Sequence, residues 1–219
     1  MPKSYLPVGL RLDGRRCLIV GGGVVAFRKL KTLIDKAADV TVIAPEHNAG
    51  IEELREAGRI HVISRAYRSP EAGNYDLVIS ATGVQAVDRA VYDDCRRAKV
   101  PVNVVDDPAH CDFIFPAVID RGSLTLAVST DGRAPYLASF IRRMLAPIFG
   151  PQWQAVTDLA EAYRAEIRRR YPDDRKKRQE CYQRFLAVDW PSLFASAAPE
   201  EVERQYTAVL DSLDAGERK

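Results

Sequence analysis

The first half of the chain alternates short apolar runs with stretches in which apolar residues recur at helical spacing. Each apolar run has the length and composition of a strand that is covered on both faces of a sheet. Strands that alternate with helices predict a parallel sheet with right-handed crossovers, which is the α/β class. The predicted strands are residues 17–20, 40–44, 60–64, 76–81 and 102–105. The predicted helices are residues 24–35, 50–57 and 86–98.

The pattern changes after residue 112. Residues 113–119 and 124–129 are two apolar runs joined by the polar turn at residues 120–123, so they predict an antiparallel hairpin. A helix is predicted after Pro135, to about residue 149. Two apolar strands outside the parallel sheet need another surface to cover them. We expect a homodimer contact here, with docking inside the same chain as the alternative.

The rest of the chain is helical and rich in charge. Helices are predicted at residues 153–171, 173–187 and 199–213, and we expect residues 214–219 to be disordered. Pro172, Pro191 and Pro199 separate the helical segments. The chain is therefore expected to divide into a sheet domain at residues 1–112, a dimerisation region at 113–150 and a helical domain at 151–219.

A glycine-rich turn follows the first predicted strand. Gly21, Gly23 and Ala26 complete the pattern G-x-G-x-x-A. The first residue permits a tight turn, the second lets a pyrophosphate approach the backbone, and the third lets the next helix lie close to the strand. That helix offers its N-terminal amides and the positive end of its dipole to the anion. The motif predicts a dinucleotide-binding Rossmann domain, with an ordinary glycine turn as the alternative.

The choice of dinucleotide depends on the end of the second strand. Glu46 lies 23 residues after Gly23, near the position where an acidic side chain binds the adenosine ribose, although Pro45 displaces it past the strand. A carboxylate without a neighbouring arginine favours NAD over NADP. Ligands of open parallel sheets bind beyond the carboxyl ends of the strands. Three segments should meet in one crevice there, residues 21–25, 81–83 and 106–108.

Composition narrows the class of protein. The chain has 219 residues, 47% of them hydrophobic, and no apolar run of about 18 residues that could span a membrane. Its first residues lack the apolar core of a signal peptide, so we expect a cytoplasmic protein with no membrane partner. The four cysteines are scattered without a C-x-x-C pair, which predicts neither disulfides nor a structural zinc site.

Charge adds little evidence for a macromolecular partner. The net charge of +2 is too small to argue for nucleic acid. The basic runs at residues 168–170 and 175–178 are typical of solvated helix faces. The alternative is that some of these arginines bind the carboxylates of a ligand, since arginine pairs with carboxylates through two hydrogen bonds.

The order of these motifs resembles that of a known family. The chain reads YLPVGLRLDGRRCLIVGGGVVAFRK, then VTVIAP, then NVVDDPAHCDFIFPAVIDRGSLTLAVST, then a Gly-x-x-Pro helix. This order resembles the precorrin-2 dehydrogenase family of siroheme synthesis, from residue 5 to about 145 and more loosely beyond. The family includes stand-alone dehydrogenases, bifunctional dehydrogenase/ferrochelatases and trifunctional siroheme synthases. We expect the methyltransferase half of the trifunctional enzymes to be absent here.

The resemblance implies a fold and an activity. The fold is an NAD-binding Rossmann domain, a small dimerisation region and a helical domain. The activity is removal of a hydride and a proton from precorrin-2 by NAD to give sirohydrochlorin, followed in some members by insertion of ferrous iron to give siroheme. Members with one and with two activities share these motifs, so iron insertion stays open. A different class of function is a regulatory module that senses NAD and binds a partner through its basic tail.

The resemblance also assigns an essential carboxylate, Asp106, directly after Asn-Val-Val. At the tip of a strand it could accept a proton while a hydride leaves for the nicotinamide. The alternative is that Asp106 only caps the Asp-Asp-Pro turn. Asp107 is the neighbouring rival, and His110 is expected to be a hydrogen-bonding residue rather than a metal ligand. No set of metal ligands is predicted.

The remaining site residues divide into two groups. The expected cofactor-binding residues are the motif residues Gly21 and Gly23, then Val24, Val25, Pro45 and Glu46, which the resemblance implies, and Thr82 at the end of the fourth predicted strand. The expected substrate-binding residues are Thr130, Arg142 and Arg143. Thr130 matches a hydroxyl position near the substrate pocket of the family, where some members have serine. The two arginines follow the predicted hairpin and are candidates to bind the carboxylates of a tetrapyrrole.

Overall fold

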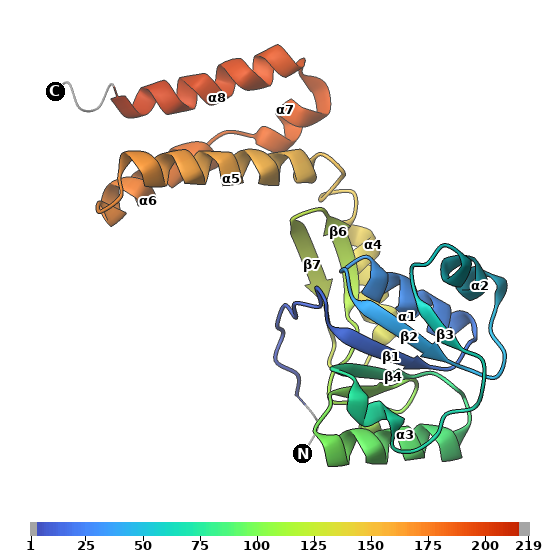
Figure 1. The fold of residues 1–219 in the computed structure, drawn as a ribbon. Coiled ribbons are helices and arrows are strands. Elements are labelled where there is room, and N and C mark those ends of the chain that lie inside the picture. The colour runs from blue at the N-terminus through green and yellow to red at the C-terminus, as the bar shows by residue number, and fades with distance from the viewer. Residues whose placement is uncertain (1–3, 215–219) are drawn as a thin grey trace. The chain divides into compact units, whose positions relative to one another are not determined.

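The computed structural model describes residues 4–214. The chain forms two compact units, Met1–Phe115 and Pro116–Lys219. The first contains the parallel sheet and the second contains a hairpin and the remaining helices (Figure 1). The finer boundary expected at residue 150 stays a prediction.

The first unit is a five-stranded parallel sheet in the order β3-β2-β1-β4-β5. The strands are β1 Arg16–Val20, β2 Asp39–Ile43, β3 His61–Ile63, β4 Leu77–Ser80 and β5 Val102–Val104. The helices are α1 Val24–Ile34, α2 Ala49–Glu56 and α3 Gln85–Ala98, with 3-10 turns η1 Glu71–Asn74 and η2 Pro108–His110. The predicted α/β class is confirmed, and every predicted strand end lies within one residue of the observed one.

The middle strand β1 shows why the strands of this sheet could be predicted from the sequence. Cys17 and Ile19 pack with α1 and α2 on one face of the sheet. Leu18 and Val20 pack with α3 on the other. Because both faces are covered (Figure 1), every residue from 17 to 20 is apolar and buried. The strand thereby holds the glycine turn that follows it at a defined place on the sheet edge.

The second unit begins with the hairpin of β6 Ala117–Arg121 and β7 Leu124–Val128, which pair antiparallel. The expectation that the first hairpin strand starts at residue 113 is wrong. Phe113 and Phe115 instead pack against the core of the parallel sheet. The Asn103 side-chain amide donates a hydrogen bond to the Phe113 carbonyl at 2.9 Å. Pro116 has no N–H to donate to a strand ladder, so pairing begins after it.

The helix after the hairpin, α4 Pro135–Leu145, is shorter than expected. The sequence predicts that it continues to residue 149. Pro147 explains the difference, because a proline has no N–H to donate to the carbonyl four residues earlier and so cannot continue the helical hydrogen-bond ladder. The helix therefore ends one turn early.

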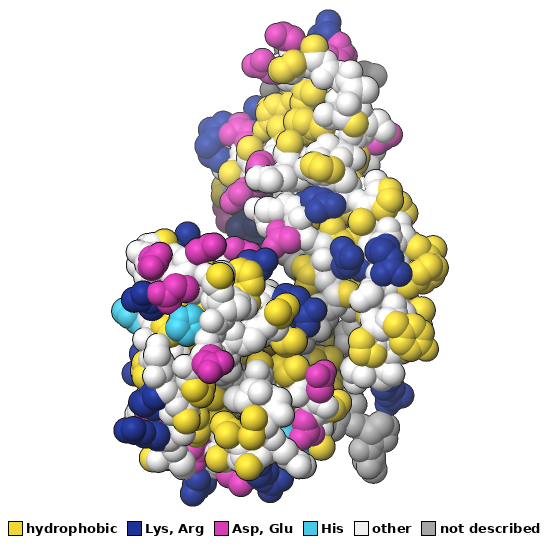
Figure 2. Space-filling model, turned by 90° about the vertical axis from the view of Figure 1, so that its right-hand side faces the viewer, with side chains coloured by type: hydrophobic (Ala, Val, Ile, Leu, Met, Phe, Trp, Pro, Cys, Tyr) yellow, Lys and Arg dark blue, Asp and Glu magenta, His cyan; other side chains and the backbone are white. Residues whose placement is uncertain are grey.

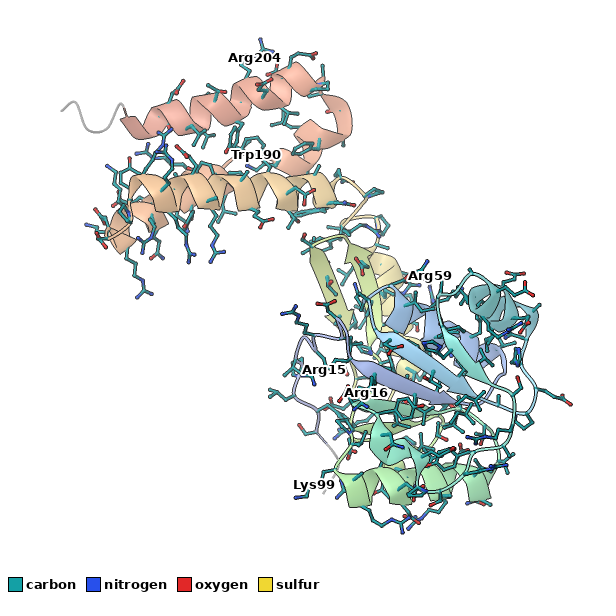
Figure 3. The ribbon with its side chains drawn as sticks, viewed as in Figure 1. Arg15, Arg16, Arg59, Lys99, Trp190 and Arg204 are labelled. Carbon is teal, nitrogen blue, oxygen red and sulfur yellow. The ribbon has the colours of Figure 1, made fainter. Side chains whose placement is uncertain are left out.

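The tail folds into four helices around its own core. They are α5 Trp153–Arg170, α6 Arg175–Leu186, α7 Trp190–Ser196 and α8 Pro199–Asp214. Trp190 lies among them (Figure 3), stacked on Phe185 with ring centroids 4.9 Å apart, and its indole N–H donates to the Phe185 carbonyl at 2.7 Å. Helix α7 was not predicted, although Asp189 caps it through the Ser192 amide and Pro191 lies in its first turn. Disorder was expected over residues 214–219. Asp214 is instead the last residue of α8, and residues 215–219 lie outside the described residues.

Two features bear on the class of protein. Within residues 4–214, no helix is both long enough and apolar enough to span a membrane. The four cysteines are buried free thiols. Burial raises the pKa of Cys17 to about 11, so its thiol is protonated and unreactive at neutral pH.

Candidate functional site

The glycine turn after β1 has the tight geometry that its motif predicts. Gly21 adopts a φ of +117°, which favours glycine, and a Cβ there would collide with the Ala81 carbonyl. Its amide donates to the Ile43 carbonyl at 2.9 Å. The turn is thereby anchored between the ends of β2 and β4, at the carboxyl edge of the sheet.

Gly22, between the two motif glycines, is a residue whose role the sequence analysis missed. A Cβ at Gly22 would collide with the Glu46 carbonyl and would lie 2.8 Å from the His47 Cβ. The Asn48 amide also donates to the Gly22 carbonyl at 3.0 Å. The segment that carries Pro45 and Glu46 therefore packs directly on the glycine turn. The run of three glycines was the visible signal for this close approach.

Helix α1 presents an open N-terminus. Its cap, Gly23, has no side chain, and its first turn contains no acidic residue. The Phe27 amide donates to the Gly23 carbonyl at 3.0 Å, so the amides before Phe27 have no partner inside the helix. Val24 is 78% exposed. An anion such as a pyrophosphate fits these amides and the positive end of the helix dipole.

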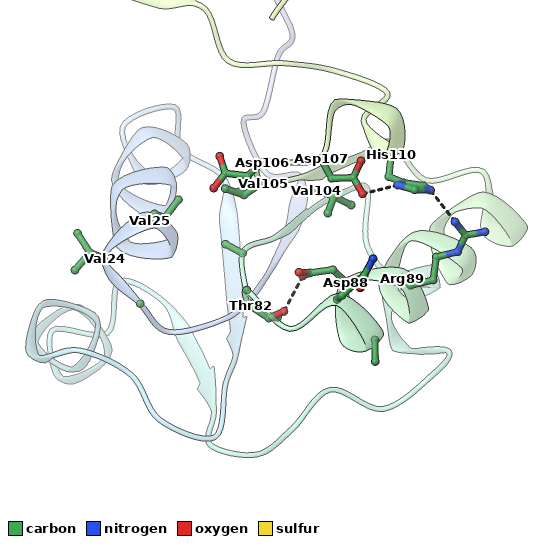
Figure 4. A pocket seen from close by; sticks show the side chains of 15 residues that line it. Val24, Val25, Thr82, Asp88, Arg89, Val104, Val105, Asp106, Asp107 and His110 are labelled. Carbon is green, nitrogen blue, oxygen red and sulfur yellow. Dashed lines mark hydrogen bonds and ion pairs between the residues drawn. The ribbon is translucent and has the colours of Figure 1, made fainter. Parts of the chain in front are cut away.

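A cavity of about 880 Å³ adjoins this turn. It is lined by the start of α1, the loop after β4, the first turns of α3, the end of β5 and η2 (Figure 4). Its size is that of a ligand pocket. Of the expected site residues, the lining includes Gly23, Val24, Val25, Thr82 and Asp106. Gly21, Pro45 and Glu46 are not among the lining residues.

Asp106 follows β5 at the cavity with an unusual backbone. Its φ is +62°, in the left-handed region that aspartate tolerates better than most residues. Its carboxylate is exposed and accepts no hydrogen bond from the residues that the structure describes, which argues against a capping role. In Figure 4 the Asp106 carboxylate points toward the side of the pocket on which Val25 lies, whereas the Asp107 carboxylate points to His110. The two neighbouring carboxylates therefore have different surroundings.

Asp107 belongs to a chain of three side chains on the cavity wall. Its carboxylate lies 2.5 Å from Nδ1 of His110, and Nε2 of that ring lies 2.7 Å from an Nη of Arg89. The hydrogen bond from His110 holds the pKa of Asp107 below its usual range. The sequence analysis considered Asp107 and His110 but missed Arg89, because only the fold brings α3 next to η2.

Thr82 has its hydroxyl committed within the protein. It donates to the Asp88 carboxylate at 2.7 Å and accepts from the Val84 amide at 3.0 Å. Ser80 donates to the same carboxylate oxygen at 2.6 Å. The hydroxyl thus shapes the loop between β4 and α3, and a contact from Thr82 to a cofactor stays a prediction.

Lys29 is a third residue that the sequence analysis missed. Its ammonium lies 3.7 Å from the centre of the Phe115 ring. Burial and, to a smaller extent, the charge of Arg28 lower the pKa of Lys29 to about 8, although Cys111 and Asp106 oppose the shift. A cation close to its titration range therefore lies within the electrostatic reach of Asp106. The adjacent Arg-Lys pair in α1 gives no sequence signal for this, because it resembles any basic helix surface.

The three expected substrate contacts lie in the second unit. The Thr130 hydroxyl accepts a hydrogen bond from the Ala134 amide at 3.0 Å and shapes the turn before α4. Arg142 and Arg143 lie in the last turn of α4. Their part in binding a substrate stays a prediction.

Comparison with known proteins agrees with this site. Residues 8–117, about half of the chain, match the family model described as putative NAD(P)-binding. The chain belongs to this family. Residues 121–146, which follow the NAD(P)-binding domain, match a second model described as sirohaem biosynthesis protein central. The predicted Rossmann domain and its dinucleotide cofactor are confirmed.

Individual relatives of this chain are siroheme synthases. A siroheme synthase of Methylococcus capsulatus is 39% identical over 216 residues, which cover 99% of this chain and 45% of the relative. A siroheme synthase of Thioalkalivibrio sulfidiphilus is 36% identical over 217 residues, which cover 97% of this chain and 44% of the relative. The chain thus spans about half the length of the curated relatives it matches.

A solved structure is similar along its whole length. It is titled SirC, precorrin-2 dehydrogenase, is 26% identical, and superposes with a TM-score of 0.74 over 96% of this chain and 100% of its own. The resemblance to the siroheme-synthesis family, inferred from sequence motifs, is confirmed.

Proposed function

We propose that this chain is an NAD-dependent precorrin-2 dehydrogenase of siroheme biosynthesis. In this reaction precorrin-2 loses a hydride, with its electron pair, and a proton, and becomes sirohydrochlorin. The observation that carries the proposal is the carboxylate of Asp106, exposed and without a hydrogen-bonding partner among the described residues, at the cavity of an NAD(P)-binding domain. The similarity to siroheme synthases and to the structure titled precorrin-2 dehydrogenase supports this choice of substrate.

Different residues of the chain are assigned to cofactor binding, proton transfer and substrate binding. The open amides of α1 bind the pyrophosphate, and the close packing of Gly22 on the following loop brings Glu46 to the ribose, which favours NAD over NADP. NAD, when bound, accepts the hydride. Asp106 accepts the proton, since a carboxylate placed beside the reacting carbon is a suitable base. Thr130, Arg142 and Arg143 are the further residues that we propose for substrate binding.

The proposal includes a homodimer in the cytoplasm. Apolar side chains gather in patches on the face shown in Figure 2. Helix α4 exposes large apolar side chains one and two turns apart, which is typical of a helix that packs on a partner. The exposed residues are Tyr136, Leu137, Phe140 and Met144, with Ile148 just beyond. A second copy of the chain is the partner that we propose.

The first test is anaerobic absorbance of the protein with precorrin-2 and NAD, followed by ferrous iron. We expect the sirohydrochlorin spectrum only when NAD is present. The Asp106→Ala variant should lose at least about 100-fold in turnover, because a general base contributes on this scale, while its NAD affinity stays unchanged. Asp13→Ala removes an exposed carboxylate whose one ion-pair partner among the described residues is Arg11; it is the matched control and should turn over normally.

Several outcomes would contradict this proposal. Normal turnover by Asp106→Ala would remove Asp106 from the mechanism. NAD binding without any change in the precorrin-2 spectrum would favour the NAD-sensing module. The addition of ferrous iron tests for ferrochelatase activity separately. Only a spectral change that is faster with the enzyme than without it would show that ferrous iron is a substrate.

A further inference from the structure

Arg89 lies on the cavity wall in the second turn of α3. Its Nε donates to the Asp93 carboxylate at 3.2 Å, and an Nη lies 2.7 Å from Nε2 of His110. The Tyr92 ring lies beneath the guanidinium, 5.5 Å away. The other Nη has no hydrogen-bond partner among the residues that the structure describes. The guanidinium is therefore held in place on the cavity wall, while one of its donor groups has no partner among the described residues.

The contacts of His110 define its protonation. A guanidinium can only donate hydrogen bonds, so Nε2 of His110 must accept from Arg89. The ring proton is then on Nδ1 and is donated to the Asp107 carboxylate, 2.5 Å away. The Tyr92 ring meets the imidazole edge-to-face at 4.5 Å and restrains its tilt. Asp107 and Tyr92 thus orient a neutral imidazole, which in turn orients Arg89.

We propose that Arg89 binds a carboxylate of the tetrapyrrole substrate, and that Asp107 and His110 are its positioning residues. The proposal rests on the proposed function, because precorrin-2 supplies the carboxylates. A planar guanidinium matches a carboxylate in geometry and charge. Figure 4 shows Arg89 well apart from Val24 and Val25, where α1 offers its amides to the pyrophosphate. The cavity thus has separate places for a cofactor anion and a substrate anion.

Binding and kinetics of Arg89→Gln test the proposal. We expect its affinity for sirohydrochlorin, the reaction product, to fall on the order of 10- to 100-fold, which is typical for loss of a charge-assisted hydrogen bond. KM for precorrin-2 should rise by a similar factor, with little change in kcat or in NAD affinity. Arg59→Gln removes an exposed arginine of the same unit (Figure 3) that does not line the cavity, and should behave as wild type.

Variants of His110 test the positioning role. His110→Leu removes the acceptor and should raise KM several-fold without changing kcat. His110→Gln keeps an oxygen acceptor for Arg89 and should restore most of the affinity. A purely structural role would lower NAD affinity and thermal stability in both variants and would give no rescue by glutamine.

Three results would overturn this inference. One is unchanged sirohydrochlorin affinity in Arg89→Gln. Another is an equal loss of NAD affinity, which would assign Arg89 to the cofactor or to the fold. The third is a loss in kcat alone. Failure of the proposed function is distinguishable, because the wild-type protein itself would then bind NAD but neither bind sirohydrochlorin nor oxidise precorrin-2.

Discussion

At the scale of single residues, Asp106 and Asp107 show how backbone geometry separates two identical side chains. The left-handed φ of Asp106 turns its carboxylate away from that of Asp107, which instead accepts a hydrogen bond from Nδ1 of His110. The sequence identifies both as candidates and orders them only through a family resemblance. A φ value and a hydrogen bond distinguish the surroundings of the two carboxylates, which supports the proposal that Asp106 is the base.

Asp94 is a buried carboxylate that should stabilise the first unit. It accepts hydrogen bonds from Tyr67 at 2.6 Å and Ser69 at 2.7 Å and pairs with Arg97. Burial alone would raise the pKa of Asp94, but these hydrogen bonds outweigh it and hold the pKa below its usual value. We expect Asp94→Asn to lower the free energy of unfolding by about 2 kcal/mol at pH 7, measured by urea unfolding.

The pH dependence gives this prediction a second readout. Because the pKa of Asp94 is lower in the folded state, its stabilisation is complete above the unfolded pKa of about 4 and is lost as the pH falls through the folded pKa. The stability difference between wild type and Asp94→Asn should therefore shrink in acid. Asp13→Asn, at an exposed ion pair, should change stability by less than about 0.5 kcal/mol. A difference that persists unchanged in acid would contradict the role of the charge.

At the scale of elements, the accuracy of the sequence prediction depended on what covers each segment. The strands of the parallel sheet are buried on both faces, so their apolar runs mark their ends closely. Phe113 and Phe115 have the same apolar character but serve as packing against the sheet. Apolar composition predicts burial, and only the fold decides whether the buried segment is a strand.

The glycine turn gives a prediction at this scale. Gly22→Ala should push the segment at residues 45–48 off the turn, because the new Cβ meets the Glu46 carbonyl. We expect a loss of about 1–3 kcal/mol in the free energy of unfolding and weaker NAD binding, measured by urea unfolding and NAD titration. Gly23→Ala meets no protein atom within 4 Å, so it should keep stability and weaken only NAD binding.

The control for both changes is Gly9→Ala, in open space outside the motif. It should leave both measurements close to wild type. Equal stability of Gly22→Ala and Gly23→Ala would show that the observed packing of Gly22 does not matter.

At the scale of the whole molecule, the exposed face of α4 predicts self-association. Phe140→Asp places a charge in the middle of this apolar face and should weaken the homodimer at least about 30-fold, because buried aromatic side chains dominate such interfaces. Sedimentation should show twice the mass of the chain for wild type and a monomer for the variant. NAD binding should persist, since the cavity lies in the first unit.

Leu186→Asp is the matched control for this experiment. Leu186 is also a large exposed apolar residue, but it lies at the end of α6. This variant should remain a dimer. A wild-type protein that sediments only as a monomer would refute the proposed interface.

The sequence by itself determined the α/β class, the glycine turn and the family, because continuous apolar runs and small residues at set spacing are local consequences of burial and close approach. Only the tertiary structure decided which side chains share the cavity. Arg89, His110 and Asp107 meet there because α3 and η2 pack at the same edge of the sheet. The residue spacing in α3 or in η2 does not predict this contact, because a contact between segments far apart in the sequence does not affect the periodicity of either segment.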